Sequence, residues 1–286
     1  MKPDWLKKPW RASAEMQGVE DLVHELGLNT VCREASCPNY CECFSRGTAT
    51  FMILGSVCTR NCSFCGVTSA DIGAATCRPP DSGEPVRVAE AVARLNLSYV
   101  VVTSVTRDDL ADGGAAHFAA TIQAIRRLAP ETNVEILIPD FGGSEGALDT
   151  VIEARPDVIS HNMETVRALY SKVRPQADYN RSLALLRRIA AHSPGIKPKS
   201  GLMVGLGETE SQVLELMDDL RAAGCEIITI GQYLRPSPEN IPVEAYIEPA
   251  TFDRWAEEAK ARGFTHVASA PFVRSSYHAE EAFPKQ

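Results

Sequence analysis

The chain has 286 residues, 44% of them hydrophobic, and a formal net charge of -8. A chain of this size can bury one large core, so we expect a single α/β domain with terminal extensions. The acidic balance argues against a general nucleic-acid binder, which needs clustered Lys and Arg. No apolar run approaches the roughly 20 residues of a membrane span, and residues 1–15 lack the apolar core of a signal peptide. We therefore expect a cytoplasmic protein that binds neither nucleic acid nor membranes.

From residue 48 onward, short β-rich runs alternate with helical patterns, which is typical of βα units around a parallel sheet. The predicted strands are 48–55, 98–104, 133–139, 157–160, 199–206 and 226–231. The predicted helices between them are 86–96, 117–129, 147–154, 177–192 and 210–224. In such folds ligands gather at the carboxyl ends of the strands. The loop after the first strand is therefore the expected place for chemistry.

That loop is rich in cysteine. Seven of the nine cysteines fall between Cys32 and Cys65, and the run CTRNCSFC (58–65) places Cys58, Cys62 and Cys65 directly after the first predicted strand. Cytosolic thiols are kept reduced, so this density favours metal or redox chemistry over disulfides. Three thiolates can hold a compact inorganic core and leave one metal position open for a substrate. A zinc site completed from elsewhere in the chain is the alternative, although zinc ribbons favour CxxC pairs.

The CxxxCxxC spacing in this position resembles the signature of the radical S-adenosylmethionine (SAM) superfamily, and Phe64, just before the last cysteine, also fits it. The resemblance implies that Cys58, Cys62 and Cys65 hold a [4Fe-4S] cluster whose fourth iron binds SAM. The segments CREASCPNYCEC, ATFMILGSVCTRNCSFC and VRSSYHAEE together resemble the lipoyl synthase family, and this closer resemblance runs through nearly the whole chain.

The family resemblance implies an α/β fold, a partial (β/α)6 TIM-like barrel with extensions at both ends. Residues 1–47 would form an N-terminal extension that carries an auxiliary cluster motif. Residues 48–268 would form the radical SAM core, and residues 269–286 a C-terminal extension with the RSSY motif.

A second cysteine cluster precedes the predicted barrel. On the resemblance, Cys32, Cys37 and Cys43 match the ligands of an auxiliary [4Fe-4S] cluster. Ser275 of the RSSY run, in preference to Ser276, would supply the fourth ligand. A hydroxyl oxygen is a harder and weaker partner for iron than a thiolate, which suits a cluster that comes apart during the reaction.

The sequence departs from the family pattern at a few positions. Cys41 stands where the family usually has glycine. We expect that Cys41 does not bind the auxiliary cluster. The alternative is that Cys32, Cys37 and Cys41 are the ligands. Arg235 and Asn240 stand where the family tends to have Gln and His, so no detailed role is predicted for their loop.

Polar residues at successive strand ends are candidate SAM contacts. For the ammonium group of methionine the candidates are Thr103, Ser104, Asp108 and Asp109. For the ribose hydroxyls and a carboxylate they are Asn162, Glu164 and Arg174. Gly205 is the candidate for the adenine side, because glycine lets a flat ring approach the backbone closely. Judged singly, most of these residues are explained equally well by N-cap or turn roles, so the prediction depends on their shared location.

The family resemblance also implies an activity: insertion of two sulfur atoms at C6 and C8 of an octanoyl chain amide-linked to a lysine of a lipoyl carrier domain. The auxiliary cluster would donate the sulfur, and two SAM molecules would be used per lipoyl group. No side chain is predicted to be catalytic, because a positioned acid or base cannot activate such carbons and the clusters carry the chemistry.

The implied partners are octanoylated carrier domains, namely the E2 subunits of 2-oxoacid dehydrogenases or the H protein of glycine cleavage. An electron donor such as flavodoxin or ferredoxin, and an iron-sulfur cluster carrier, complete the set. Three alternatives stay open. One is a biotin synthase-like enzyme that acts on a free small molecule. The second is a non-catalytic iron-sulfur carrier or zinc-stabilised scaffold, which would not cleave SAM after reduction. The third is a paralogue that binds SAM but lacks sulfur insertion, with Cys41 as its only indication.

Overall fold

The computed structural model describes residues 2–8, 13–70, 77–192 and 195–283. The chain divides into two compact units, which are described separately. The N-terminal unit comprises Trp10–Asn61 and Gly66–Ile159, and the C-terminal unit comprises Met1–Pro9, Cys62–Cys65 and Ser160–Gln286. Among the helices in the described ranges, none combines the length and the apolar character needed to cross a membrane.

A parallel sheet forms the centre of the N-terminal unit. Strand β2 (Thr50–Ile53) pairs in parallel with β5 (Tyr99–Ser104), and β5 pairs in parallel with β6 (Asn133–Leu137). The short β1 (Asn29–Thr30) is antiparallel to β2. Every residue of β2 is buried, as are the inner residues of β5 and β6. Continuous apolar runs of this kind are typical of parallel strands covered on both faces.

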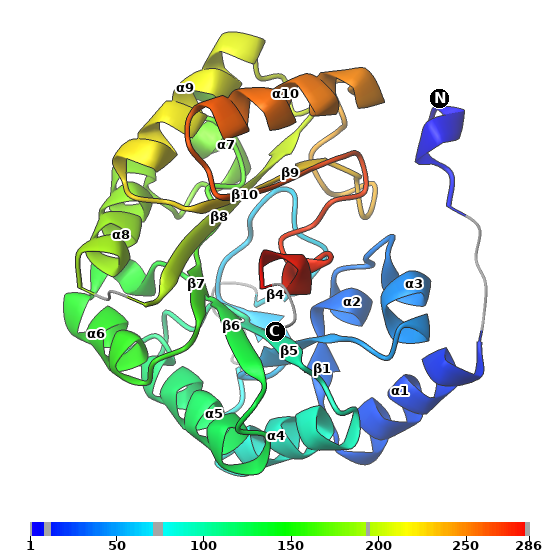
Figure 1. Ribbon diagram of the computed structural model, residues 1–286, viewed down its shortest axis with the longest axis vertical. Coiled ribbons are helices and arrows are strands. Elements are labelled where there is room, and N and C mark those ends of the chain that lie inside the picture. The colour runs from blue at the N-terminus through cyan, green and yellow to red at the C-terminus, as the bar shows by residue number, and fades with distance from the viewer. Residues whose placement is uncertain (1, 9–12, 71–76, 193–194, 284–286) are drawn as a thin grey trace. The chain divides into compact units, whose positions relative to one another are not determined.

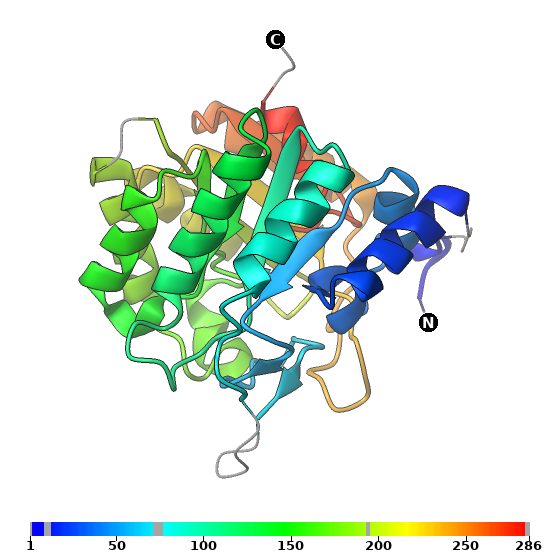
Figure 2. The ribbon, with the colours of Figure 1, turned by 90° about the horizontal axis from the view of Figure 1, so that it is seen from below.

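Helices pack along this sheet. They are α1 (Ala14–Glu25), α2 (Val31–Glu34), α3 (Tyr40–Ser45), α4 (Glu84–Arg94), α5 (Ala115–Leu128) and α6 (Glu145–Glu153). Figure 2 shows α4, α5 and α6 side by side, and their contacts bury apolar side chains such as Val88, Phe118 and Val151. A second, two-stranded parallel sheet joins β3 (Val57–Cys58) to β4 (Thr68–Ser69). Strand β7 (Val158–Ser160) stands where the chain passes into the C-terminal unit.

The C-terminal unit repeats the same pattern. Strand β9 (Ile227–Gln232) lies between β8 (Lys197–Val204) and β10 (His266–Ser269), and both pairings are parallel. The helices are α7 (Tyr170–Val173), α8 (Tyr179–His192), α9 (Glu210–Ala222) and α10 (Pro249–Ala261), and Figure 1 shows α8, α9 and α10 along the outer side of these strands. Helix α9 begins with a capping box between Thr209 and Gln212, which satisfies two backbone N–H groups of its first turn.

The observed elements confirm the predicted α/β class. Each predicted strand and helix is present, with ends shifted by a few residues. The sequence analysis missed one more helix–strand pair, α10 and β10, as well as the elements before β2, the two-residue strands β3 and β4, and the short helix α7. Strand β10 has four residues, all of intermediate burial, so it lacks the continuous apolar run that identified the other strands.

Gly114 gives a stability prediction within the N-terminal unit. It has a φ of +92°, and a Cβ at this position would overlap the side chain of Leu54. We expect Gly114→Ala to lower the free energy of unfolding by roughly 2–4 kcal/mol, since it combines a left-handed backbone with overpacking. Gly27→Ala is the matched control, because Gly27 has a φ of +60° and no atom within 4 Å of the added Cβ. Urea unfolding that gives equal losses for both variants would contradict this account.

Candidate active site

The turn after β2 presents the first cysteine of the CTRNCSFC loop. Leu54 adopts a left-handed conformation with φ 69°, and its N–H donates to Oε2 of Glu84 at 2.8 Å. Arg107 donates from Nη1 to the Leu54 carbonyl at 3.3 Å. Both groups that hold the turn are themselves buried. These bonds fix the backbone at the end of β2, and Cys58 follows this turn, three residues after Gly55.

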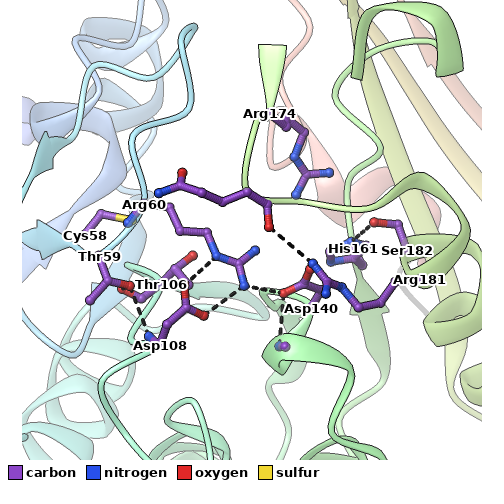
Figure 3. A network of polar contacts seen from close by, with 12 residues as sticks. Cys58, Thr59, Arg60, Thr106, Asp108, Asp140, His161, Arg174, Arg181 and Ser182 are labelled. Carbon is purple, nitrogen blue, oxygen red and sulfur yellow. Dashed lines mark hydrogen bonds and ion pairs between the residues drawn. The ribbon is translucent and has the colours of Figure 1, made fainter. Parts of the chain in front are cut away.

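Arg60 is the centre of a buried ionic network in the same loop (Figure 3). Its Nε and Nη2 donate to both carboxylate oxygens of Asp108 at 2.7 and 2.8 Å, and Nη2 also donates to Oδ1 of Asp140 at 2.6 Å. The side chains of Arg60 and Asp140 are 6% and 0% exposed. Burial alone would lower the pKa of Arg60, but its bonds to the two carboxylates raise the pKa above its usual value. The Arg60 N–H donates to Sγ of Cys58 at 3.4 Å.

The two carboxylates predicted to bind the ammonium group of SAM therefore each have an arginine partner. Asp109 accepts bonds from Nε and Nη2 of Arg107 at 2.8 and 2.7 Å, and this partner lowers the pKa of Asp109. The Asp108 N–H also donates to Oγ1 of Thr59, at 3.0 Å. The side chains of Asp108 and Asp109 remain 42% and 39% exposed. Oxygen lone pairs of both thus stay accessible to a further donor.

Thr103 and Ser104 end strand β5 in the same unit. The Thr103 hydroxyl donates to the carbonyl of Leu137 at 3.0 Å. The Ser104 hydroxyl is buried and has no hydrogen-bond partner among the described residues. A buried hydroxyl that lacks a partner costs free energy, so it favours a polar ligand at this position.

The second half of the loop belongs to the C-terminal unit. The Cys65 N–H donates to the Cys62 carbonyl at 3.1 Å and closes a turn, and the Ser63 N–H donates to the Val173 carbonyl at 3.0 Å. Phe64 packs against a buried apolar cluster formed by Val173, Leu206, Tyr233 and Ile241. The aromatic residue of the motif thus anchors the segment that carries Cys62 and Cys65.

Four predicted site residues of the C-terminal unit share one hydrogen-bond network. The Ser275 hydroxyl donates to Oδ1 of Asn162 at 3.2 Å, and Nδ2 of Asn162 donates to Oε1 of Glu164 at 3.0 Å. Arg174 donates from Nη1 to the Asn162 carbonyl at 2.8 Å. Burial raises the pKa of Glu164, although Arg174 acts in the opposite direction. The predicted SAM residues after β7 and the predicted cluster-binding serine are therefore neighbours.

Arg174 also has an unsatisfied donor. Its Nη1 bonds to the Met163 carbonyl and the Tyr170 hydroxyl as well, but its buried Nε has no partner among the described residues. The residue as a whole is 8% exposed. A buried guanidinium N–H without an acceptor is costly, and a ligand carboxylate would supply the acceptor. This observation fits the carboxylate of SAM.

Gly205 follows β8 and has a φ of +94°. Its N–H donates to Oε1 of Glu208 at 2.5 Å, and a Cβ here would overlap Gln232 and the carbonyl of Ala245. Contacts within the chain therefore already require glycine at this position, independently of any adenine ring.

The three cysteines predicted to bind the auxiliary cluster lie in the N-terminal unit. Cys32 is buried in α2, and its carbonyl accepts a bond from the Cys37 N–H at 3.1 Å. Cys43 lies in α3, where its carbonyl accepts the Thr48 N–H at 3.0 Å. Burial first, and then the nearby Cys37, raise the pKa of the Cys32 thiol to about 11. Cys41 shares α3 with Cys43, two residues away.

In the ranges that the structure describes, no three His, Cys, Asp or Glu side chains form a preassembled metal site. The chemistry of the two cysteine sets nevertheless fits iron-sulfur clusters, which are held by Cys thiolates. Cys225 is fully buried in the C-terminal unit, as expected for a small core residue, and burial raises its pKa.

Two residues of the site were missed by the sequence analysis. Arg60 lies inside the cysteine motif, and Asp140 directly follows the predicted strand 133–139. A charged residue between two predicted ligands and an acidic residue at the carboxyl end of a strand were both available signals. Their pairing, however, joins residues 80 positions apart and depends on the tertiary fold.

Comparisons with known proteins identify the class of this fold and site. Residues 52–220 match the family model of the Radical SAM superfamily. The structure resembles methylornithine synthase, with a TM-score of 0.52 and 15% identity over 92% of this chain and 87% of that one. It also resembles SuiB of Streptococcus suis bound to S-adenosylmethionine, with a TM-score of 0.58 and 12% identity over 86% and 56%. The chain is a radical SAM protein with the α/β partial-barrel fold of that superfamily, which implies a [4Fe-4S] cluster and SAM as cofactors.

Sequence relatives define the family more narrowly. The lipoyl synthase of Oleidesulfovibrio alaskensis is 55% identical over 277 residues, which are 97% of this chain and 93% of the relative. The lipoyl synthase of Caldanaerobacter subterraneus is 56% identical over 279 residues, or 98% and 96%. The chain belongs to the lipoyl synthase family.

Proposed function

We propose that this chain is a lipoyl synthase that inserts sulfur at C6 and C8 of an octanoyl group amide-linked to a lysine of a carrier domain. The observation that carries the proposal is the 55% identity to a lipoyl synthase over 97% of the chain. Residues 1–47 then form the extension with the auxiliary motif, 48–268 the radical SAM core and 269–286 the C-terminal extension.

In this proposal Cys58, Cys62 and Cys65 hold the first [4Fe-4S] cluster. When bound, that cluster and SAM together supply a radical that removes hydrogen from an unactivated carbon, which no side-chain acid or base can do. The chain's own contribution is to hold the three thiolates on one loop. Arg60 fixes the first half of this loop through its bonds to Asp108, and Phe64 fixes the second half by packing against the apolar cluster.

The chain also supplies groups that bind and orient SAM. The buried Nε of Arg174 would donate to the carboxylate, and the buried Ser104 hydroxyl oxygen would accept from the ammonium group. The ammonium group would be bound by Thr103, Ser104, Asp108 and Asp109. The ribose hydroxyls would be bound by Asn162 and Glu164, with the backbone at Gly205 on the adenine side. The unpartnered Nε of Arg174 and the unpartnered hydroxyl of Ser104 each support the role proposed for that residue within its own unit.

Cys32, Cys37, Cys43 and Ser275 would hold the auxiliary [4Fe-4S] cluster, which is the proposed sulfur source. The Ser275 hydroxyl donates to Oδ1 of Asn162, and this bond orients its side chain. An oxygen ligand binds iron more weakly than a thiolate, and the cluster must release sulfide. Two SAM molecules would be used for each lipoyl group, one for each carbon.

The proposed partners follow from this chemistry. The substrate would be an octanoylated carrier domain of a 2-oxoacid dehydrogenase E2 subunit or of the glycine cleavage H protein. Flavodoxin or ferredoxin would supply electrons, and an iron-sulfur cluster carrier would rebuild the auxiliary cluster.

The direct test is an anaerobic assay with the reconstituted protein, reductant and SAM. The protein is given an octanoylated carrier domain or, in parallel, free octanoate, and products are followed by mass spectrometry. Lipoyl groups on the carrier alone would support the proposal. Sulfur insertion only into the free acid would favour the biotin synthase-like alternative, and absence of SAM cleavage after reduction would favour the iron-sulfur carrier.

Replacement of Ser275 by alanine should separate SAM cleavage from sulfur insertion. We expect Ser275→Ala to cleave SAM at a rate close to wild type but to lose nearly all lipoyl product, because the auxiliary cluster loses its fourth ligand. Ser276→Ala is the matched control and should retain product. The same assay checks both variants, and the reverse pattern would assign the ligand to Ser276.

A further inference from the structure

A closed loop follows β9 in the C-terminal unit and reaches the cysteine motif. Arg235 donates from Nε to the carbonyl of Asn240 at 2.7 Å and from Nη2 to the carbonyl of Pro238. The Asn240 N–H donates to the Ser237 carbonyl at 3.2 Å. These bonds close residues 235–240 into a compact turn and fix the position from which the Asn240 side chain projects.

The orientation of the Asn240 carboxamide follows from its partners. Oδ1 accepts from the Ser237 N–H at 3.2 Å and from the Ser237 hydroxyl at 2.8 Å. A backbone N–H can only donate, so the amide oxygen must face Ser237. Nδ2 then faces two backbone carbonyls, which can only accept: Cys65 at 2.8 Å and Ser63 at 3.3 Å.

The next residue reinforces this contact. The Ile241 N–H donates to the Ser63 carbonyl at 2.9 Å, and the Ile241 side chain belongs to the apolar cluster that receives Phe64. The opposite side of the segment is held by Val173, whose carbonyl accepts the Ser63 N–H. Ser63 is therefore fixed by several groups, and the carbonyl of Cys65 accepts a bond from the side chain of Asn240.

We propose that Asn240 is a positioning residue for the first cluster: its carboxamide fixes the Ser63–Cys65 backbone and so presents Cys65 to iron. Its role would be exerted through the main chain of a ligand, because its Nδ2 donates to the carbonyls of Ser63 and Cys65. This proposal rests on the proposed function, because it takes Cys58, Cys62 and Cys65 as cluster ligands.

The test compares two variants in the full-length, anaerobically reconstituted protein, in a background with Cys32, Cys37 and Cys43 changed to alanine so that one cluster remains. Asn240→Asp keeps the acceptor for Ser237 but loses both bonds donated to the carbonyls. Ser237→Ala removes the hydroxyl bond within the loop and keeps both donated bonds. The readouts are the rate of iron loss to a chelator, the electron paramagnetic resonance spectrum of the reduced cluster with and without SAM, and the thermal midpoint of the iron-free protein.

Asn240→Asp should lose iron about tenfold faster than the parent, which is the effect of two ordinary hydrogen bonds. It should also show an altered spectral response to SAM, while Ser237→Ala behaves like the parent and the iron-free midpoints of all three proteins agree. Iron loss from Asn240→Asp at the parent rate, or equal acceleration in both variants, would overturn the proposal. If the parent protein with one cluster retains no iron, the proposed function itself is contradicted. The iron content of the parent shows this before the variants are compared.

Discussion

Replacing Arg60 with methionine is expected to lower the free energy of unfolding by about 3–5 kcal/mol, because it removes one partner of a buried ion pair and leaves the buried carboxylate of Asp140 less compensated. The Asp140 side chain is 0% exposed and accepts Nη2 of Arg60 at 2.6 Å. The Gly142 N–H also donates to this carboxylate at 3.1 Å, but a neutral donor does not replace the positive charge of Arg60. Urea unfolding of the iron-free protein measures the difference.

Asp108→Asn is the control for this prediction. The Asp108 side chain is 42% exposed, so its ion pair with Arg60 is screened by solvent and should contribute at most about 1 kcal/mol. An Arg60→Met variant as stable as Asp108→Asn would show that the buried pair does not hold this loop together.

Replacing Cys62 with alanine is expected to abolish reductive cleavage of SAM. A cluster that has lost one of three thiolates is no longer held in the geometry that leaves one iron for SAM, and only uncatalysed background should remain. Measurement of methionine release after reduction checks this, with iron content determined on the same sample. Cleavage at the wild-type rate would exclude Cys62 as a ligand.

Cys225→Ala is the matched control for the cysteine prediction. Cys225 is fully buried, and burial raises the pKa of its thiol, which favours the neutral form over a thiolate ligand. The variant should keep both its iron and its SAM cleavage, although loss of the sulfur atom leaves a small cavity. A loss of activity equal to that of Cys62→Ala would mean that the assay reports folding and not ligation.

The local features of this protein could be predicted from the sequence. The spacing of Cys58, Cys62 and Cys65 is a short-range property, and the alternation of apolar strands with helical patterns is visible within windows of ten residues or so. Strand β10 was missed because its four residues are only partly buried, so the apolar signal is weak. Helices and strands could thus be predicted wherever consecutive or periodic residues are buried and therefore apolar.

Pairings between distant residues could not be predicted in this way. Asp108 and Asp109 are adjacent, yet Asp109 pairs with the neighbouring Arg107 while Asp108 pairs with Arg60, 48 positions away. The contact from Asn240 to Cys65 spans 175 positions. Such contacts are set by the packing of separate loops, which a single sequence does not encode in any local pattern.

In the proposed function, two cysteine sets hold two clusters with different roles. The most direct measurement is iron and sulfide per chain after anaerobic reconstitution, for the wild type and for a variant in which Cys32, Cys37 and Cys43 are changed to alanine. We predict about eight irons in the wild type and about four in the variant, as expected for two four-iron clusters. About four irons in both proteins would contradict the account, because a radical enzyme would then remain without its sulfur donor.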